Sequence, residues 1–126
     1  MTLAEGIRRI GFRKWYEREL LTGHAHLAIL LLCVLALMMA LEASTRATSA
    51  QDRAVDVLTV LLCAGAGLWA LRRYLWLLTH AEAVANQADC PRCQTYGRLE
   101  LLRSNASGDE VGVRCRHCGH EWDIYG

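Results

Sequence analysis

The chain has 126 residues, of which 14 are basic and 13 acidic, so its formal net charge at pH 7 is only +1. This balance excludes a long-range field that would draw the whole protein to nucleic acid. Hydrophobic residues make up 53% of the composition, and the length accommodates two membrane helices and one small module.

Residues 1–19 are polar, with basic and aromatic side chains. Leu3, Ile7 and Ile10 share one helical face, but the aromatic residues point elsewhere, so the amphipathic pattern is modest. We expect a cytoplasmic lead-in helix whose Trp15 and Tyr16 lie at the level of the lipid headgroups. The alternative is a solvated basic helix. Removal as a secretory signal is disfavoured because the charged segment is long.

Residues 20–80 are predicted to form a hairpin of two transmembrane helices. The first apolar stretch covers residues 20–41 and the second covers residues 57–78. Each stretch provides the roughly 20 helical residues that cross a hydrocarbon core about 30 Å thick. The polar residues 42–53 connect them and are predicted to lie outside the cell. Basic residues flank the other ends of both helices, which places both termini in the cytoplasm by the positive-inside rule.

Arginine supplies every basic residue except Lys14, and alanine and leucine are abundant. This bias is typical of GC-rich bacterial genomes. We therefore expect a multi-pass protein of the bacterial inner membrane.

Arg72 and Arg73 interrupt the apolar pattern of the second helix. An arginine in the middle of a membrane costs about 2.5–3.5 kcal/mol on insertion scales. We therefore expect both side chains near the cytoplasmic boundary, with the guanidinium groups reaching lipid phosphates and Trp76 in the interfacial belt. The alternative is that they face a carboxylate of a partner subunit.

Small residues recur at helical spacing in both apolar segments. In lipid, small residues allow close backbone approach and so favour helix association. We expect the two helices to touch along these positions, although the second helix could also pack against another copy or another protein. The positions are Cys33, Ala36 and Ala40 in the first segment and Thr59, Cys63, Gly67 and Ala70 in the second.

Residues 81–89 are predicted to continue the second helix as a stalk, and residues 90–126 to form a small β module. Strands are expected at residues 98–103, 110–114 and 121–125, with a turn at 105–109. Two C-x-x-C pairs, Cys90 with Cys93 and Cys115 with Cys118, frame the first two strands. Paired spacing of this kind is typical of a metal site in a reducing compartment. Four sulfurs in a tetrahedron suit zinc, with iron or a redox dithiol as alternatives.

This C-P-x-C … C-x-x-C-G-H pattern resembles the zinc-ribbon family over residues 89–126. The resemblance implies a small antiparallel sheet in which Cys90, Cys93, Cys115 and Cys118 bind one structural Zn²⁺. One departure is Gln94, where many members have glycine. The predicted fold is thus a membrane helical hairpin plus an all-β zinc ribbon, and we expect metal removal to unfold the ribbon and spare the helices.

His117 and His120 could act as spare ligands but are expected to be surface residues, since four thiolates are available. His24 and His80 lie near the same predicted boundary, where a shared metal, haem or quinone contact is an alternative to simple solvation.

No catalytic triad, phosphate-binding loop or carboxylate pair is recognisable, so we expect neither enzymatic activity nor a small-molecule substrate. The favoured function is an accessory, assembly or scaffolding subunit that contacts membrane lipid and a protein partner or another copy of itself. The alternative is a membrane-tethered nucleic-acid-binding or regulatory zinc ribbon. Nucleic acid is disfavoured because residues 89–126 carry five arginines against six acidic residues.

Overall fold

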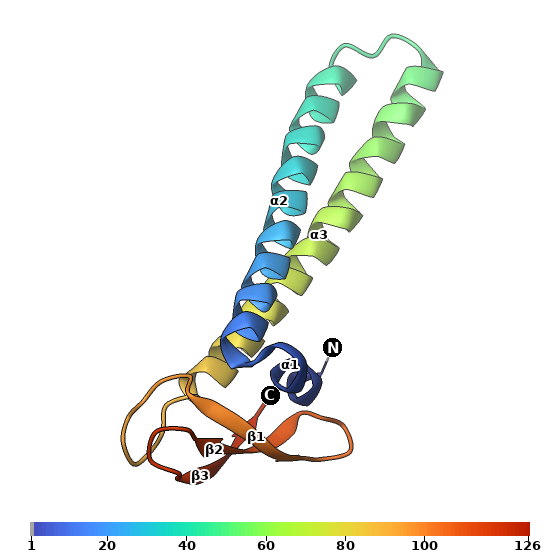
Figure 1. Cartoon of the computed structure of the whole chain (residues 1–126). Coiled ribbons are helices and arrows are strands. Elements are labelled where there is room, and N and C mark those ends of the chain that lie inside the picture. Colours follow the sequence, from blue (N-terminus) through green and yellow to red (C-terminus); the bar gives the residue numbers. More distant parts are fainter. Residues whose placement is uncertain (1) are drawn as a thin grey trace. The chain divides into compact units, whose positions relative to one another are not determined.

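The structure is a computed structural model that describes residues 2–126. Over these residues, three helices precede a three-stranded sheet (Figure 1). In chain order the elements are α1 (Leu3–Ile10), α2 (Phe12–Ser44), α3 (Ala50–Asn86), β1 (Leu99–Ser104), β2 (Glu110–Cys115) and β3 (Glu121–Tyr125). The chain forms two compact units. One comprises the chain up to Leu21 together with Leu77–Gly126, and the other is Thr22–Trp76.

The expected lead-in helix over residues 1–19 is interrupted at Gly11. This residue has φ 83° and ψ 159°, a conformation that favours glycine and ends α1, and α2 begins at the next residue. The interruption resets the helical phase, so the apolar face of α1 is not diluted by the aromatic residues that follow. Leu3 and Ile7 are buried as a result.

The connector between α2 and α3 is shorter than expected. Only residues 45–49 lie outside the helices, whereas the polar composition indicated residues 42–53. Polar groups stabilise both helix ends: Glu42 pairs with Arg46 at 3.0 Å, and the Ser49 hydroxyl accepts a hydrogen bond from the Asp52 backbone N–H at 3.1 Å. At its other end, α3 continues to Asn86, into the expected stalk over residues 81–89.

The sheet is antiparallel with the order β1-β2-β3, and its strands agree closely with the predicted ones. Leu99 pairs with Cys115, and Val111 pairs with Ile124. A bulge at Leu102 shifts the register of β1. The turn before β2 is held by the side-chain oxygen of Asn105. This oxygen accepts a hydrogen bond from the Gly108 backbone N–H at 2.7 Å.

One face of this sheet is covered by helical residues of the same unit. The buried cluster, all between 0% and 6% exposed, consists of Leu3, Ala4, Ile7, Phe12, Trp15, Val84, Ala88, Leu99, Val111, Val113 and Ile124. The strands contribute four of these residues, Leu99, Val111, Val113 and Ile124. The additional residues from α1, the start of α2 and the end of α3 therefore enlarge it considerably.

The expectation that Trp15 lies among lipid headgroups is corrected by this core. Its side chain is 1% exposed and lies so close to Gly6 that a Cβ there would be 2.1 Å from Trp15 Cδ1. The His80 ring lies edge-on to the indole at a centroid distance of 6.2 Å. Tyr16 packs against the same cluster and is half-buried. The physical reason is that the break at Gly11 folds α1 back, so the first turn of α2 faces the sheet.

In the unit Thr22–Trp76, α2 and α3 meet at small residues. A Cβ at Gly67 would lie 3.4 Å from Cys33 Cβ, which leaves ordinary contact and no gap. Ala70 and Ala40 are buried at 0% and 7% exposure, and the other predicted packing residues, Ala36, Thr59 and Cys63, are half-buried. Both helices are long and apolar enough to cross a membrane.

Candidate metal centre

Two loops of matching backbone geometry present the four cysteines. In the first, the Gln94 N–H donates to the Cys90 carbonyl at 2.9 Å; in the second, the Gly119 N–H donates to the Cys115 carbonyl at 3.0 Å. A second backbone hydrogen bond closes each loop. In the first loop the Cys90 N–H donates to the Thr95 carbonyl at 3.2 Å, and in the second the Cys115 N–H donates to the His120 carbonyl at 2.8 Å. The two C-x-x-C segments are therefore equivalent knuckles.

The fourth position after the first cysteine of each knuckle is left-handed. Gly119 has φ 76°, as glycine readily allows, and Gln94 has φ 58°. Gln94 is the only non-glycine residue with positive φ among residues 2–126. At Gln94 the same loop shape is thus kept at the cost of backbone strain.

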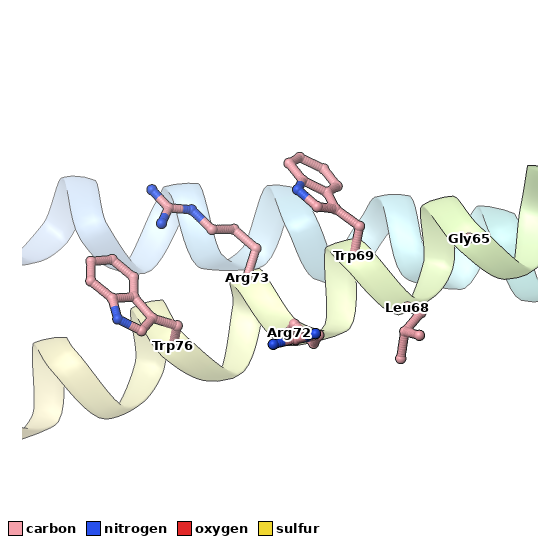
Figure 2. A pocket seen from close by; sticks show the side chains of 6 residues that line it. All are labelled: Gly65, Leu68, Trp69, Arg72, Arg73 and Trp76. Atoms are coloured by element: carbon pink, nitrogen blue, oxygen red, sulfur yellow. The ribbon is translucent and has the colours of Figure 1, made fainter.

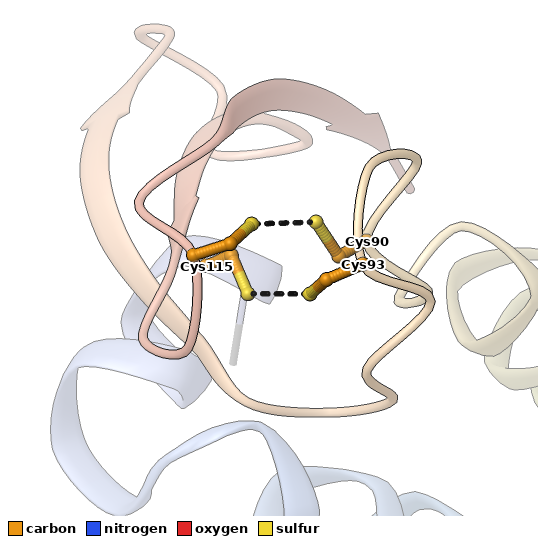
Figure 3. A group of neighbouring side chains, drawn as sticks. Cys90, Cys93 and Cys115 are labelled. Carbon is orange, nitrogen blue, oxygen red and sulfur yellow. Dashed lines mark hydrogen bonds between the residues drawn. The ribbon is translucent and has the colours of Figure 1, made fainter.

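The four sulfur atoms converge. They lie within 4.8 Å of one another, with Cys90 Sγ 3.4 Å from Cys118 Sγ and Cys93 Sγ 3.6 Å from Cys115 Sγ. Figure 3 shows Cys90 and Cys93 facing the second knuckle across a small gap. A tetrahedron with metal–sulfur bonds of about 2.3 Å has sulfur–sulfur edges of about 3.8 Å. The cluster therefore matches the size of a four-thiolate site.

Cysteine burial differs within each knuckle in the same way. Cys90 and Cys115, the first cysteine of each pair, are each 1% exposed, whereas Cys93 and Cys118 are half-buried. The backbone N–H of His117 points at Cys115 Sγ at 3.4 Å. Four sulfurs would fill the coordination shell of a tetrahedral ion, and no further position would be left for water or substrate.

The thiols differ in acidity in the metal-free site. Hydrogen bonding between Cys93 Sγ and the Thr95 side chain, whose Oγ1 lies 3.1 Å away, and between Cys93 and the Thr95 backbone lowers the pKa of Cys93 to about 5. At Cys118, the His120 backbone N–H favours the thiolate, but burial and the neighbouring cysteine sulfurs outweigh it and raise the pKa to about 12. Thr95 thus makes the Cys93 thiol easier to ionise, whereas burial and the neighbouring sulfurs make the Cys118 thiol harder to ionise.

The two histidines of the second knuckle do not join the sulfur cluster found among residues 2–126. His117 is exposed, and His120 stacks on Trp122 with 6.2 Å between ring centroids. This arrangement agrees with the expectation that they are surface residues.

Sequence reasoning missed two residues that position the centre. Thr95 is one, and its only signal was a hydroxyl two positions after Cys93. Gln87 is the other. Its side chain donates a hydrogen bond to the Tyr125 carbonyl at 2.8 Å and accepts one from the Tyr125 backbone N–H at 3.0 Å. Its backbone carbonyl accepts a hydrogen bond from Trp122 Nε1 at 2.9 Å. Gln87 therefore fixes β3 to the end of α3, and nothing in the local sequence marked it.

The remaining predicted site residues lie outside the centre. Arg72, Arg73 and Trp76 are exposed on α3, and Cys33 and Cys63 are half-buried in the helix pair. No family model matches the chain, and no similarity to a curated protein or to a solved structure is detected.

Proposed function

We propose that α2 and α3 cross a bacterial inner membrane as a hairpin, with both termini in the cytoplasm, and that the four cysteines bind one structural Zn²⁺ as a zinc ribbon. Exposed leucines on the two helices support the membrane part: Leu32 and Leu61 are each 65% exposed. In water such a surface would be strongly unfavourable, whereas lipid tails solvate it. The metal part is supported by the spacing of the sulfurs.

We further propose that the protein is a non-catalytic accessory, assembly or scaffolding subunit of a larger membrane complex or of a homo-oligomer. The observation that carries this proposal is the shared core in which Trp15 and Val84, from the ends of α2 and α3, pack with strand residues such as Val111. Because the strands share a core with these helix ends, the sheet has a fixed orientation relative to them. Together with a closed metal site, this rigidity suits docking rather than turnover.

Nucleic-acid binding receives less support. Arg103 is paired with Asp123 at 2.7 Å, and Arg114 with Glu121 at 2.8 Å. These pairs neutralise two of the ribbon's arginines on the face of the sheet that no helix covers, which weakens the counterion-release contribution to nucleic-acid affinity.

The proposal is tested by purifying the full chain in mild detergent and identifying what accompanies it by mass spectrometry. We expect a stoichiometric protein partner, or a defined homo-oligomer, that is retained at high salt with wild type and lost from Cys115→Ser. Cys33→Ser is the matched control, because that cysteine lies outside the metal cluster, and it should retain the partner. A monomer without any companion, or salt-sensitive RNA alone, would contradict the proposal.

Topology is tested separately with reporters fused to either end and inserted at residue 47, in the connector. We expect cytoplasmic signals from both ends and an external signal from the connector. Any other combination would overturn the proposed orientation.

A further inference from the structure

Two adjacent arginines on α3 have no counter-charge nearby. Arg72 and Arg73 form no ion pair in the part of the chain that the structure describes, where the ion pairs involve other arginines. Residues 57–81 of α3 contain no acidic residue, and neither do residues 20–41 of α2. Arginine carries a positive charge that is spread over its planar guanidinium group. No described residue forms an ion pair with either guanidinium group, which leaves both groups available to an anion from outside the chain.

A surface groove begins at these arginines. It has a volume of about 440 Å³ and is lined by Gly65, Leu68, Trp69, Arg72, Arg73 and Trp76. At one end Gly65 leaves open space, since a Cβ there would meet nothing within 4 Å, and Leu68 is 61% exposed. The other end is cationic. The groove is thus apolar at one end and positively charged at the other.

The aromatic residues orient the charge. The Arg73 guanidinium carbon lies 4.7 Å from the centroid of the Trp76 ring, within the range of a cation–π interaction. Figure 2 shows Arg73 extending along the helix in the direction of Trp76 and away from Gly65. Stacking restrains the guanidinium plane and leaves its N–H edge available to an oxygen acceptor.

The position along the helix matches a lipid headgroup. If the hydrocarbon begins at Val57, the residue after Asp56, then Arg72 lies about 22 Å along the helix at 1.5 Å per residue. The hydrocarbon core is about 30 Å thick. Both arginines therefore lie roughly two turns or less from the opposite boundary, within reach of the phosphate layer by snorkelling.

We propose that this groove binds an anionic phospholipid, whose phosphodiester contacts Arg72 and Arg73 while one acyl chain lies along Leu68 and Gly65. This inference rests on the proposed membrane hairpin. Two positive charges favour an anionic lipid over a zwitterionic one, because the latter neutralises its own phosphate with a cationic ammonium group. A partner's carboxylate would satisfy the arginines but would leave the apolar end of the groove unfilled.

The test measures lipid binding to the delipidated full chain in detergent by native mass spectrometry. The probes are phosphatidylglycerol and phosphatidylcholine. We expect wild type to prefer phosphatidylglycerol by a factor of roughly thirty, as two basic residues near the phosphate would produce. The double substitution R72Q/R73Q should bring the preference close to one. R46Q/R53Q removes the same charge near the connector and should leave it unchanged.

A second variant separates the apolar end from the charge. Gly65→Leu fills the groove while both arginines remain, so lipid retention should fall several-fold. An equal affinity of wild type for both lipids would overturn the inference, and so would displacement of the lipid by millimolar inorganic phosphate. Recovery of a protein partner that R72Q/R73Q loses while the lipid preference stays unchanged would assign the arginines to that partner instead. Carbonate extraction of membranes tests the proposed hairpin separately. A chain that stays in the membrane fraction supports the hairpin whatever the lipid result, whereas a chain released by carbonate does not span the membrane.

Discussion

The matching knuckles predict opposite effects for two substitutions at equivalent positions, Gly119→Ala and Gln94→Gly. Both residues are left-handed, with φ 76° and φ 58°. A Cβ at Gly119 would meet nothing within 4 Å, so alanine there causes no clash and its cost is conformational alone. At Gln94 the cost is already present in the natural chain.

The magnitudes follow from the backbone. A left-handed conformation costs a residue with a Cβ about 1–2 kcal/mol, and glycine loses about 0.5–1 kcal/mol more entropy than alanine on folding. Gly119→Ala should therefore destabilise the ribbon by about 1 kcal/mol, and Gln94→Gly should stabilise it by up to about 1 kcal/mol. Because folding of a small metal module is coupled to metal binding, apparent Zn²⁺ affinity should fall by roughly fivefold and rise by up to fivefold, respectively.

The assay is competition for Zn²⁺ between the detergent-solubilised full chain and a chromophoric chelator at fixed pH. Gln94→Ala is the control for loss of the glutamine side chain, since it keeps the strained Cβ and should bind as wild type does. Unchanged affinity in Gly119→Ala, or weaker binding in Gln94→Gly, would refute the assignment of strain to the knuckles.

Three further predictions concern the core and the thiols. Gly6→Ala, which would normally favour a helix, should destabilise the ribbon by about 1–3 kcal/mol in a thermal or denaturant melt, because its Cβ would lie 2.1 Å from Trp15 Cδ1; equal or greater stability would contradict the packing. In metal-free protein at pH 7, Cys93 should be alkylated much faster than Cys118, because pH 7 lies above a pKa of about 5 and below one of about 12, and the reverse order by peptide mapping would be inconsistent with the site. Chelation should change tryptophan fluorescence and expose α1 to trypsin, since Trp15 and α1 share the core of the sheet, which revises the sequence-based expectation that every helix is spared; an α1 that stays protected would contradict this prediction.

The strands and the cysteines of the sulfur cluster could be predicted from local sequence because each depends on short-range spacing. Val111 and Val113 alternate with polar neighbours, and each pair of cysteines is fixed by its own knuckle. These signals do not require knowledge of distant residues. The sulfur atoms of Cys90, Cys93, Cys115 and Cys118 do cluster, which confirms that spacing alone was sufficient to identify these four residues.

The position of Trp15 could not be predicted in this way. An aromatic residue beside a membrane segment is statistically interfacial, but its burial depends on the chain reversal at Gly11 and on the small size of Gly6. Gln87 is a similar case, since its partners Trp122 and Tyr125 are more than 30 residues away. The burial of Trp15 and the hydrogen bonds of Gln87 both depend on tertiary packing, which helical periodicity in the sequence does not reveal.

The most direct test of the central claim is X-ray absorption spectroscopy at the zinc edge, combined with metal quantification, on the chain purified from membranes. The account predicts one zinc per chain with four sulfur neighbours at about 2.3 Å, and loss of that signal in a variant lacking Cys90 and Cys115. A chain that carries no metal, or zinc coordinated by nitrogen or oxygen in place of some sulfurs, would contradict it.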